Sequence, residues 1–484
     1  MEILRAAFDA ESFRAHGHRL IDQLADYLAT ALRGGPLPVL PKMDPAAQNA
    51  ALPASFPENP SGEPAEIFAR VLAGSNHLHH PRYVGHQVTA PLPLAALCDL
   101  VDALLNNGMA VYEMGPVATV MEHHLVRWMC SRLGWGDRAG GVFTSGGSAG
   151  NLTALLAARQ AKAGFDVWEA GNAGGPPLAV LVSEQAHYCI RRAVQIMGWG
   201  SAGVVSVPTD ARFRMRADAL PDAWRSAESE GRKIIAVVAS ACSTATGSFD
   251  PLEAIADFCH AHDLWLHVDG AHGASAALSD KYRPLLAGIE RADSVVWDAH
   301  KMLLMPALAT AVLFREGRRS HEAFAQEASY LFSAPDGGAP WYDIGQRTLE
   351  CTKRMIALKL YVALSVYGTR LFADYVTASF DLAKRFAARL RQAPDFELAV
   401  EPEANIVCFR YTPGGDGDLD ALQQRVRDRL LAEGTFYLVQ TRLPAGVFLR
   451  TTLINALTGD DDLAALLEAI RVAGADAQKP KAKG

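Results

Sequence analysis

Two apolar runs of the sequence end in side chains that could do chemistry. LWLHV is followed by Asp269, and SVVW is followed by Asp298, His300 and Lys301. A buried carboxylate is costly unless it meets a cation. An ammonium among apolar residues needs neutralising, and imine formation does this. The pattern therefore indicates a carboxylate and an imine-forming lysine at adjacent strand ends. Each residue also has a simpler interpretation, because Asp269 could cap the next helix and Lys301 could extend to solvent.

A third stretch carries groups that are suited to a phosphate. Residues 144–151 read TSGGSAGN and lie between an apolar run and the helical LTALLAARQAKA. Backbone N–H groups at the start of a helix bind anions, and Gly147 and Ser148 fall at that point. The turn is neither GxGxxG nor GxxxxGK[ST], and many strand-to-helix turns share its composition. His187, in SEQAHYCIRRA, follows another apolar run and is either a site residue or a core histidine.

Together these residues meet the demands of pyridoxal phosphate (PLP) chemistry. That cofactor needs a lysine for a Schiff base, a carboxylate that keeps its pyridine nitrogen protonated, and donors for its phosphate. Lys301, Asp269 and the turn at 144–151 offer these groups. Gly270 and Ala271 are small enough to let a flat ring approach the backbone. No metal site is predicted, because the cysteines show neither a CxxC pair nor zinc spacing.

Short β-rich runs that alternate with helix-length segments predict the element that positions these residues. The runs are GVF at 141–143, LAVLVS at 178–183, GVVSVP at 203–208, IIAVVAS at 234–240, LWLHV at 264–268, SVVW at 294–297 and TAVLF at 310–314. The pattern is typical of an α/β fold with a mostly parallel sheet covered by helices on both faces.

Three domains are predicted for the 484 residues. Residues 1–85 form an N-terminal helical arm, with a helix from about residue 12 and a Pro-rich strap at 34–64 that cannot sustain helix or sheet. Residues 86–365 form the large PLP-binding α/β domain, and residues 366–484 form a small α+β domain. A long helical region is expected from about Thr348, in two parts around Gly368.

Composition argues against several classes of protein. The formal charge of −7 disfavours a nucleic-acid-binding or anionic-membrane surface, which normally carries a basic patch. No apolar run reaches the roughly 18 residues of a membrane span. The seven cysteines are scattered and odd in number, and the N-terminus carries acidic groups and no long apolar segment. These features predict reduced thiols in a cytoplasmic protein that acts on a small molecule.

The order of the motifs resembles the group II pyridoxal-phosphate-dependent amino acid decarboxylases of fold type I. The shared motifs are HHPRY at 79–83, YEMGP at 112–116, TSGGS at 144–148, SEQAH at 183–187, STATGSFDPL at 243–252, HVDGAH at 267–272, DAHK at 298–301 and FLR at 448–450. That family includes glutamate, aromatic-amino-acid, cysteine-sulfinate and 2,4-diaminobutyrate decarboxylases. The resemblance therefore implies a homodimeric carboxy-lyase that releases CO2 from an L-amino acid.

The resemblance also implies a role for each matching residue. Lys301 would be the Schiff-base lysine, Asp269 the partner of the pyridine nitrogen, and His187 a ring-stacking residue that also delivers protons. The other residues implied to hold the cofactor are Gly147, Ser148, Thr244, Ala271 and His300. Arg450 would bind the substrate carboxylate, since its planar fork suits that group.

The candidate substrate-lining residues are Tyr83, His86, Gln87 and Tyr112. This mixture favours a polar substrate of the glutamate or 2,4-diaminobutyrate kind over an aromatic one. Many family members carry a tyrosine on a mobile loop that reaches across the dimer and protonates the carbanion. Here the loop at 333–346 holds Tyr342, with Tyr330 just before it.

Three departures from the family pattern bear on the site. Asp298 stands where better-known members have asparagine, and an acid there would repel a phosphate unless it were protonated or turned away. Ala149 and Gly150 replace the usual Glu-Ala, and SACST at 240–244 lacks a glycine.

Three other activities are also compatible with the sequence. Loss of the loop tyrosine is associated in the family with oxygen-dependent conversion of the amino acid to an aldehyde. An aminotransferase or cysteine-desulfurase-like enzyme on the same fold is a second alternative. A non-catalytic binding protein is a third.

Overall fold

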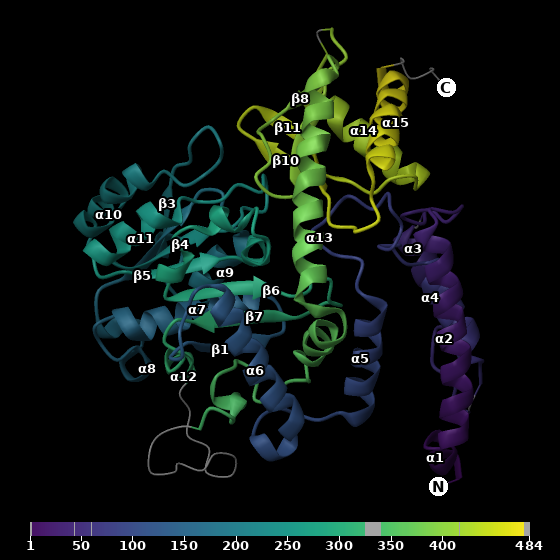
Figure 1. Cartoon of the computed structure of the whole chain (residues 1–484), viewed down its shortest axis with the longest axis horizontal. Helices are drawn as coiled ribbons and strands as arrows, with labels where there is room; N and C mark the ends of the chain where they lie inside the picture. Colours follow the sequence, from purple (N-terminus) through teal and green to yellow (C-terminus); the bar gives the residue numbers. More distant parts are fainter. Residues whose placement is uncertain (1, 43, 60, 325–339, 416, 479–484) are drawn as a thin grey trace. The chain divides into compact units, whose positions relative to one another are not determined.

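The chain divides into two compact units. The small unit comprises Met1–His86, Ala388–Ala399 and Cys408–Gly484, and the large unit comprises Gln87–Ala387 and Val400–Val407. The computed structural model describes residues 2–42, 44–59, 61–324, 340–415 and 417–478 (Figure 1). The sequence predicts a separate arm and a separate C-terminal domain, whereas the structure groups most of both in the small unit. Backbone bonds join them there, such as Val39 N to Gly434 O at 2.8 Å.

The large unit is built on a seven-stranded sheet with strand order β1-β7-β6-β5-β4-β2-β3. The strands are β1 (Gly140–Thr144), β2 (Leu178–Ser183), β3 (Val204–Val207), β4 (Lys233–Ser240), β5 (Trp265–Asp269), β6 (Ser294–Asp298) and β7 (Thr310–Phe314). The pairs β3/β2, β2/β4, β4/β5 and β5/β6 are parallel, whereas β7 runs antiparallel to both β6 and β1. The predicted α/β fold with a mostly parallel sheet is confirmed.

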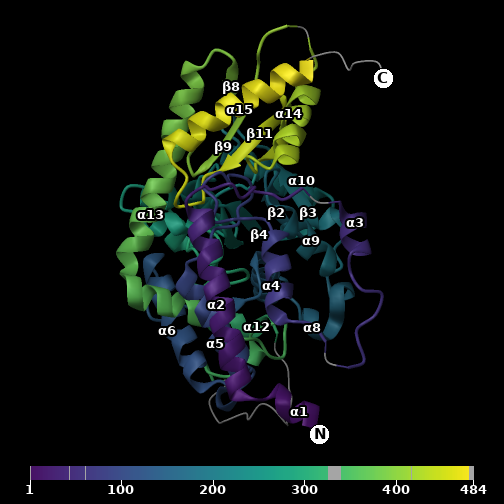
Figure 2. The same ribbon diagram turned by 90° about the vertical axis from the view of Figure 1, so that its right-hand side faces the viewer.

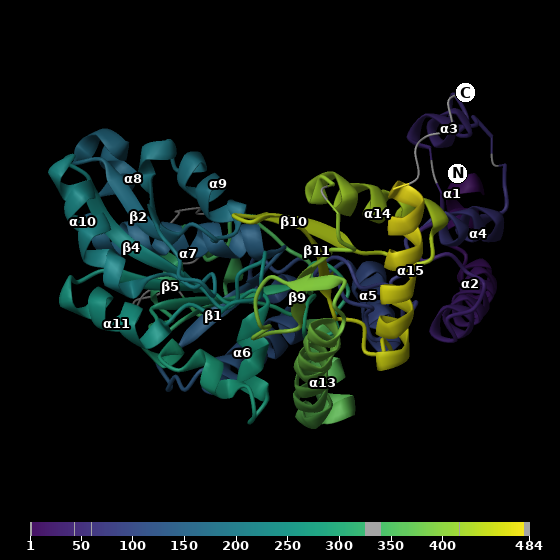
Figure 3. The same ribbon diagram turned by 90° about the horizontal axis from the view of Figure 1, so that it is seen from above.

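Helices lie on both faces of this sheet (Figure 3). This double cover explains why β2, β5, β6 and β7 are buried along their whole length and read as continuous apolar runs. The helices of the large unit that precede the long helix α13 are α5 (Pro93–Leu105), α6 (Pro116–Arg132), α7 (Gly147–Lys162), α8 (Val167–Ala170), α9 (Tyr188–Ile196), α10 (Leu220–Ser229), α11 (Leu252–Ala261) and α12 (Arg319–Glu322). Short 3₁₀ turns include η1 (Tyr112–Met114) and η5 (Gly273–Leu278).

Helix α7 packs across the middle of the sheet, against β1 and β4–β7. Its residues from Gly150 to Arg159 are all buried. A Cβ on Gly150 would lie only 3.2 Å from Thr310 Cγ2 and from Val296 Cγ2, so glycine lets the helix approach β6 and β7 closely. Gly150, one of the departures from the family pattern, therefore lies at a close contact between α7 and the sheet.

The small unit contains a four-stranded sheet of order β10-β11-β9-β8, with α14 and α15 packed beside each other next to it (Figure 2). Its strands and C-terminal helices are β8 (Phe396–Leu398), β9 (Ile406–Tyr411), α14 (Leu419–Glu433), β10 (Val439–Leu443), β11 (Gly446–Thr452) and α15 (Asp460–Gln478). Its N-terminal helices are α1 (Glu2–Ala7), α2 (Ala10–Leu32), α3 (Pro45–Ala50) and α4 (Pro64–Ala73). Helix α2 is capped by Asp9, which accepts a bond from Ser12 N at 2.7 Å.

Two local predictions need correction. The Pro-rich strap was expected to lack helix, yet α3 forms there because Asp44 caps its start and Pro45 occupies its first turn. The helical region expected from about Thr348 begins at Leu358 as α13 (Leu358–Gln392). The expected break in it is confirmed, since Gly368 has φ 74°.

None of the helices in the described ranges is long and apolar enough to cross a membrane. In the same part of the chain, no group of three or more His, Cys, Asp or Glu side chains is arranged to hold a metal ion.

Candidate active site

The predicted cofactor residues gather where several strands of the large sheet end. Asp269 pairs with Ser240 at the ends of β5 and β4, and Asp298 pairs with Thr310 between β6 and β7. Thr310 also pairs with Thr144, the last residue of β1. Because β1 and β6 are both antiparallel to β7, they run in the same direction and end at one edge. The turn into α7 therefore lies beside Asp298.

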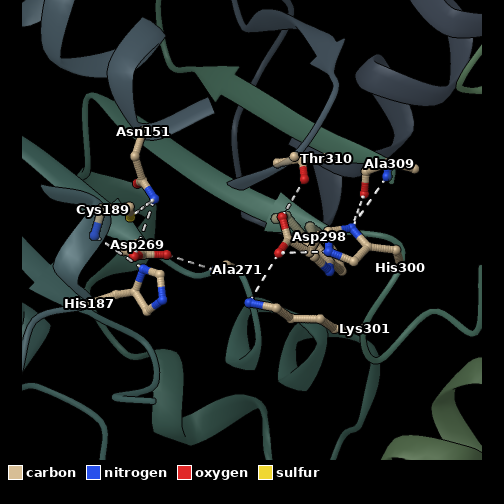
Figure 4. A network of polar contacts seen from close by, with 12 residues as sticks. Asn151, His187, Cys189, Asp269, Ala271, Asp298, His300, Lys301, Ala309 and Thr310 are labelled. Carbon is tan, nitrogen blue, oxygen red and sulfur yellow. Dashed lines mark hydrogen bonds and ion pairs between the residues drawn. The ribbon is translucent and has the colours of Figure 1, made fainter. Parts of the chain in front are cut away.

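Lys301 is held within this cluster by an ion pair. Its Nζ lies 3.0 Å from Asp298 Oδ2, and its side chain is only 19% exposed (Figure 4). Burial alone would lower the pKa of Lys301, but the negative charges of Asp298 and Asp269 outweigh it and raise that pKa. The lysine is thus turned toward carboxylates and stays an ammonium until its proton is removed. Lys301 therefore does not extend to solvent, which was the simpler interpretation of its sequence.

The Asp298 carboxylate is not turned away from the predicted phosphate site. It is 1% exposed, and a Cβ on Gly147 would lie 3.3 Å from its Oδ2 and 3.4 Å from its Oδ1. Thr310 Oγ1 donates to Oδ1 at 2.5 Å, and His300 Nε2 lies 3.6 Å from Oδ2. An acid therefore sits against the first residue of α7.

The other residues predicted to bind the phosphate also lie near the start of α7. His300 is buried, with Nδ1 3.0 Å from Ala309 O, and this contact turns Nε2 toward Asp298. Helix α7 begins after Gly146 without a side-chain cap, which leaves the amides of its first turn available to an anion. Gly147 is half-buried and Ser148 is exposed at this turn.

Asp269 accepts two hydrogen bonds, one on each carboxylate oxygen. Ala271 N donates to Oδ1 at 3.2 Å, and Asn151 Nδ2 donates to Oδ2 at 3.3 Å. The following 3₁₀ helix η5 starts after His272, with no side-chain cap. Asp269 is therefore not the cap of the next helix but a fixed acceptor at the strand end.

His187 is half-buried, so it is not a core histidine. Its Nδ1 accepts a bond from Cys189 N at 3.3 Å and caps α9 (Figure 4). Burial lowers the pKa of His187, and the nearby charges of Asp269 and Lys301 act on that pKa in opposite directions. These couplings place the imidazole in the cluster of Asp269 and Lys301.

Thr244 lies half-buried on the turn that follows β4. The turn is braced by hydroxyl contacts of 2.9 Å from Ser243 to Thr246 and from Thr246 to Ser248. Ala241 N also donates to Asp269 O at 2.9 Å. This bond fixes the turn beside the Asp269 strand end.

These residues fit PLP. A lysine turned inward, a strand-end carboxylate, an uncapped helix start and a small residue at 271 are the groups that PLP requires. The one group that opposes the phosphate is the Asp298 carboxylate, whose charge is offset in this structure by Lys301.

The predicted substrate residues fall in both units. Tyr83, His86 and Arg450 belong to the small unit, where the rings of Tyr83 and His86 lie 5.1 and 5.7 Å from the ring of Tyr437. Burial lowers the pKa of His86, and the charge of Arg450 adds to this effect, so the two side chains are near each other. Gln87 and Tyr112 belong to the large unit.

Tyr342 lies in a turn and packs against η1. Its ring lies 5.6 Å from the ring of Tyr112, and Tyr112 N donates to Asp343 Oδ1 at 3.2 Å. The Tyr342 side chain is 39% exposed. Tyr330 and residues 333–339 lie outside the described residues.

Sequence reasoning missed Asn151 and His267, which lie directly behind Asp269. His267 Nε2 is 2.7 Å from Asn151 Oδ1, and both residues are fully buried. The available signal was a polar residue inside each of two motifs, TSGGSAGN and HVDGAH.

Comparison with known proteins gives a consistent result. Residues 45–412 match the pyridoxal-dependent decarboxylase conserved domain. The chain is 32% identical to human acidic amino acid decarboxylase GADL1 over 433 residues, which is 86% of this chain and 82% of that protein. It is 30% identical to the aromatic-L-amino-acid decarboxylase of Bacillus atrophaeus over 470 residues, with 96% and 95% covered.

A solved structure shows the same fold. The crystal structure of mouse CSAD in apo form superposes with a TM-score of 0.89 at 27% identity, covering 96% of this chain and 99% of that one. The lysine and carboxylates at the strand ends, the fold and these similarities agree. The chain belongs to the pyridoxal-dependent decarboxylase family and is a PLP-dependent amino acid decarboxylase of fold type I.

Proposed function

We propose that this enzyme converts an L-amino acid with a polar side chain, of the glutamate or 2,4-diaminobutyrate kind, to its amine and CO2. The observation that carries the cofactor assignment is the inward-turned Lys301 near Asp269 at the strand ends, and the family match over residues 45–412 supports decarboxylation as the reaction. The polar preference is supported by His86 and Arg450, which lie near each other among the predicted substrate residues. One of the relatives above is named for acidic substrates, which is a second support.

Each residue of the site has a defined task in this proposal. Bound PLP supplies an electron sink for the pair of electrons left when CO2 departs. Lys301 Nζ is the attachment point, and Asp269 holds a proton at the pyridine nitrogen. The groups that bind and orient the cofactor are Gly147, Ser148, His187, Thr244, Ala271 and His300. Arg450 binds the substrate carboxylate through its guanidinium fork.

Reaction outcome depends on which group returns a proton to the substrate carbon. His187 lies beside Asp269 in the site (Figure 4), and the charges of Asp269 and Lys301 both act on its pKa, which supports it as the donor. Tyr342 packs against Tyr112, a predicted substrate residue, which supports it as a second donor. A protonated carbon gives the amine, whereas an unprotonated one can react with oxygen to give an aldehyde.

A panel of L-amino acids, assayed together for CO2, amine, aldehyde and hydrogen peroxide, tests the proposal. We expect CO2 and amine in equal amounts from a polar substrate. Formation of aldehyde and hydrogen peroxide in place of amine would contradict the amine proposal and support the oxidative alternative. Turnover without CO2 would point to the aminotransferase or desulfurase alternative and contradict ours.

We also propose that the enzyme is a homodimer. Helices α5 and α6 expose a set of apolar side chains, each between 46% and 66% exposed, namely Leu97, Leu100, Val101, Leu104, Leu105, Val117 and Val120. An exposed apolar set of this kind typically marks an interface, and the family resemblance supports a second copy of this chain as its partner.

A cytoplasmic location is proposed from the cysteines. All seven lie within the described residues and carry thiols, and all except Cys351 are buried. Cell fractionation followed by immunodetection tests this proposal, and recovery in a disulfide-forming compartment would contradict it.

A further inference from the structure

Behind Asp269, a chain of buried polar side chains runs through three elements of the large unit. Asn151 Nδ2 is 3.3 Å from Asp269 Oδ2, and Asn151 Oδ1 is 2.7 Å from His267 Nε2. His267 Nδ1 is 2.8 Å from Ser294 Oγ, which is 2.8 Å from Trp265 Nε1. Each of these four supporting residues is at most 3% exposed. The start of this chain is visible in Figure 4.

The chemistry of these groups sets the directions of the bonds, given a neutral His267 ring. An ionised Asp269 can only accept, so Asn151 must present its amide N–H groups to it and its carbonyl oxygen to His267. His267 therefore carries its proton on Nε2 and accepts at Nδ1 from the Ser294 hydroxyl. The Ser294 oxygen in turn accepts from Trp265 Nε1–H, a group that can only donate.

With a neutral imidazole at the middle of this chain, the Ser294 hydroxyl donates to Nδ1, whereas a second proton on Nδ1 would reverse that bond. Burial lowers the pKa of His267 to about 4. The ring is therefore neutral near pH 7, in agreement with the bond directions. The contacts, rather than the titration, define the arrangement.

The elements that carry these residues are themselves fixed in the fold. Asn151 stands in the second turn of α7, the helix whose first turn carries Gly147 and Ser148. His267 and Trp265 lie on β5, and Ser294 begins β6, which pairs with His267. The phosphate turn and the support of Asp269 therefore belong to one rigid helix.

We propose that Asn151 and His267 are positioning residues that hold the Asp269 carboxylate ionised and aimed at the pyridine nitrogen of PLP. Asn151 supplies the hydrogen bond, and His267, locked in one tautomer by Ser294, prevents the Asn151 amide from turning over. This inference rests on the role proposed above for Asp269.

A matched pair of serines provides the test. Ser275 Oγ accepts from Trp297 Nε1 at 2.8 Å, as Ser294 accepts from Trp265, and both serines are fully buried. Ser294→Ala and Ser275→Ala each remove an acceptor from a tryptophan, but only the first removes the donor to His267. Asn151→Leu, of similar size, breaks the chain at Asp269 itself.

The readouts are the ¹⁵N chemical shift of pyridine-labelled PLP bound to each holoenzyme across pH, and the dissociation constant of PLP. In Asn151→Leu we expect the pyridine nitrogen to lose its proton about one pH unit or more below the native enzyme. We expect PLP to bind about tenfold more weakly there. Ser294→Ala should shift both quantities in the same direction by a smaller amount, and Ser275→Ala should match the native enzyme.

Two results would overturn the inference and can be told apart. If Asn151→Leu and Ser294→Ala both behave like Ser275→Ala while Asp269→Asn abolishes the pyridine proton, the positioning role is wrong and the proposed role of Asp269 stands. If Asp269→Asn leaves the ¹⁵N shift unchanged, the role of Asp269 fails and the inference fails with it.

Discussion

At the scale of the residue, the ion pair of Lys301 and Asp298 competes with cofactor binding. Lysine must lose its proton before Nζ can attack a carbonyl, and Asp298 stabilises the protonated form at 3.0 Å. The same carboxylate faces the first residue of α7, where a phosphate would bind. Both effects make Asp298 unfavourable for PLP at neutral and higher pH.

We therefore expect Asp298→Asn to bind PLP about tenfold more tightly above pH 7, because a neutral amide neither repels phosphate nor raises the pKa of Lys301. Titration of the apoprotein with PLP, followed by fluorescence, measures this. The control is Asp293→Asn, which instead removes the charge of a partly buried carboxylate that is paired with Arg315. Weaker binding by Asp298→Asn would show that Asp298 helps to hold the cofactor.

The pKa of His267 predicts how stability depends on pH. The unfolded chain binds a proton at the ordinary pKa of 6.5, whereas burial lowers the folded value to about 4. Between these values the unfolded state holds more protons, so stability is lost as pH falls from 6.5 towards 4, by up to about 3 kcal/mol. Urea unfolding at several pH values measures this effect. The free energy of unfolding of His267→Gln apoprotein should change less with pH than that of the native apoprotein.

His321 supplies the control for that experiment. Burial, with a smaller contribution from Arg347, lowers its pKa to about 4 as well, but it lies on α12. His321→Gln should reduce the pH dependence of the free energy of unfolding by a similar amount and leave PLP binding unchanged. Equal slopes in the native protein and both variants would contradict the lowered pKa values.

At the scale of the element, α7 links the sheet to the phosphate turn. A methyl group at Gly150 would meet β6 and β7 at 3.2 Å, and a packed core accommodates such an insertion poorly. Gly150→Ala should reduce the free energy of unfolding by about 1–3 kcal/mol and weaken PLP binding as α7 shifts. Gly136→Ala is the control, since nothing lies within 4 Å of its added methyl. A variant as stable as that control would show that α7 is not closely packed.

The elements also show what could be predicted from the sequence. All seven strands of the large sheet were expected, because strands covered on both faces read as uninterrupted apolar runs. The antiparallel direction of β7 was not foreseen, since an apolar run carries no direction. Asp269 and Lys301 stood out by residue type, whereas Asn151 and His267 did not. Their role depends on donors and acceptors that meet only when α7 packs on β5.

At the scale of the whole molecule, the exposed apolar side chains of α5 and α6 predict association. Leu104→Glu should convert the proposed dimer to a monomer of about 52.0 kDa, measured by light scattering after size exclusion, because a charge would be buried unpaired. Leu104 is 65% exposed, and Val472→Glu, at 63% exposed on α15, is the control that should stay dimeric. A native protein that is already monomeric would contradict the proposed interface.

The covalent attachment of PLP to Lys301 is the most direct test of the central claim. Borohydride reduction of the holoenzyme, followed by peptide mass spectrometry, should find the cofactor on Lys301. Lys301→Ala should carry no covalent cofactor and release no CO2. Lys359→Ala, which removes another buried lysine from an ion pair with Asp99, should still be labelled on Lys301. Covalent cofactor on any other lysine, or on Lys301→Ala, would contradict the account.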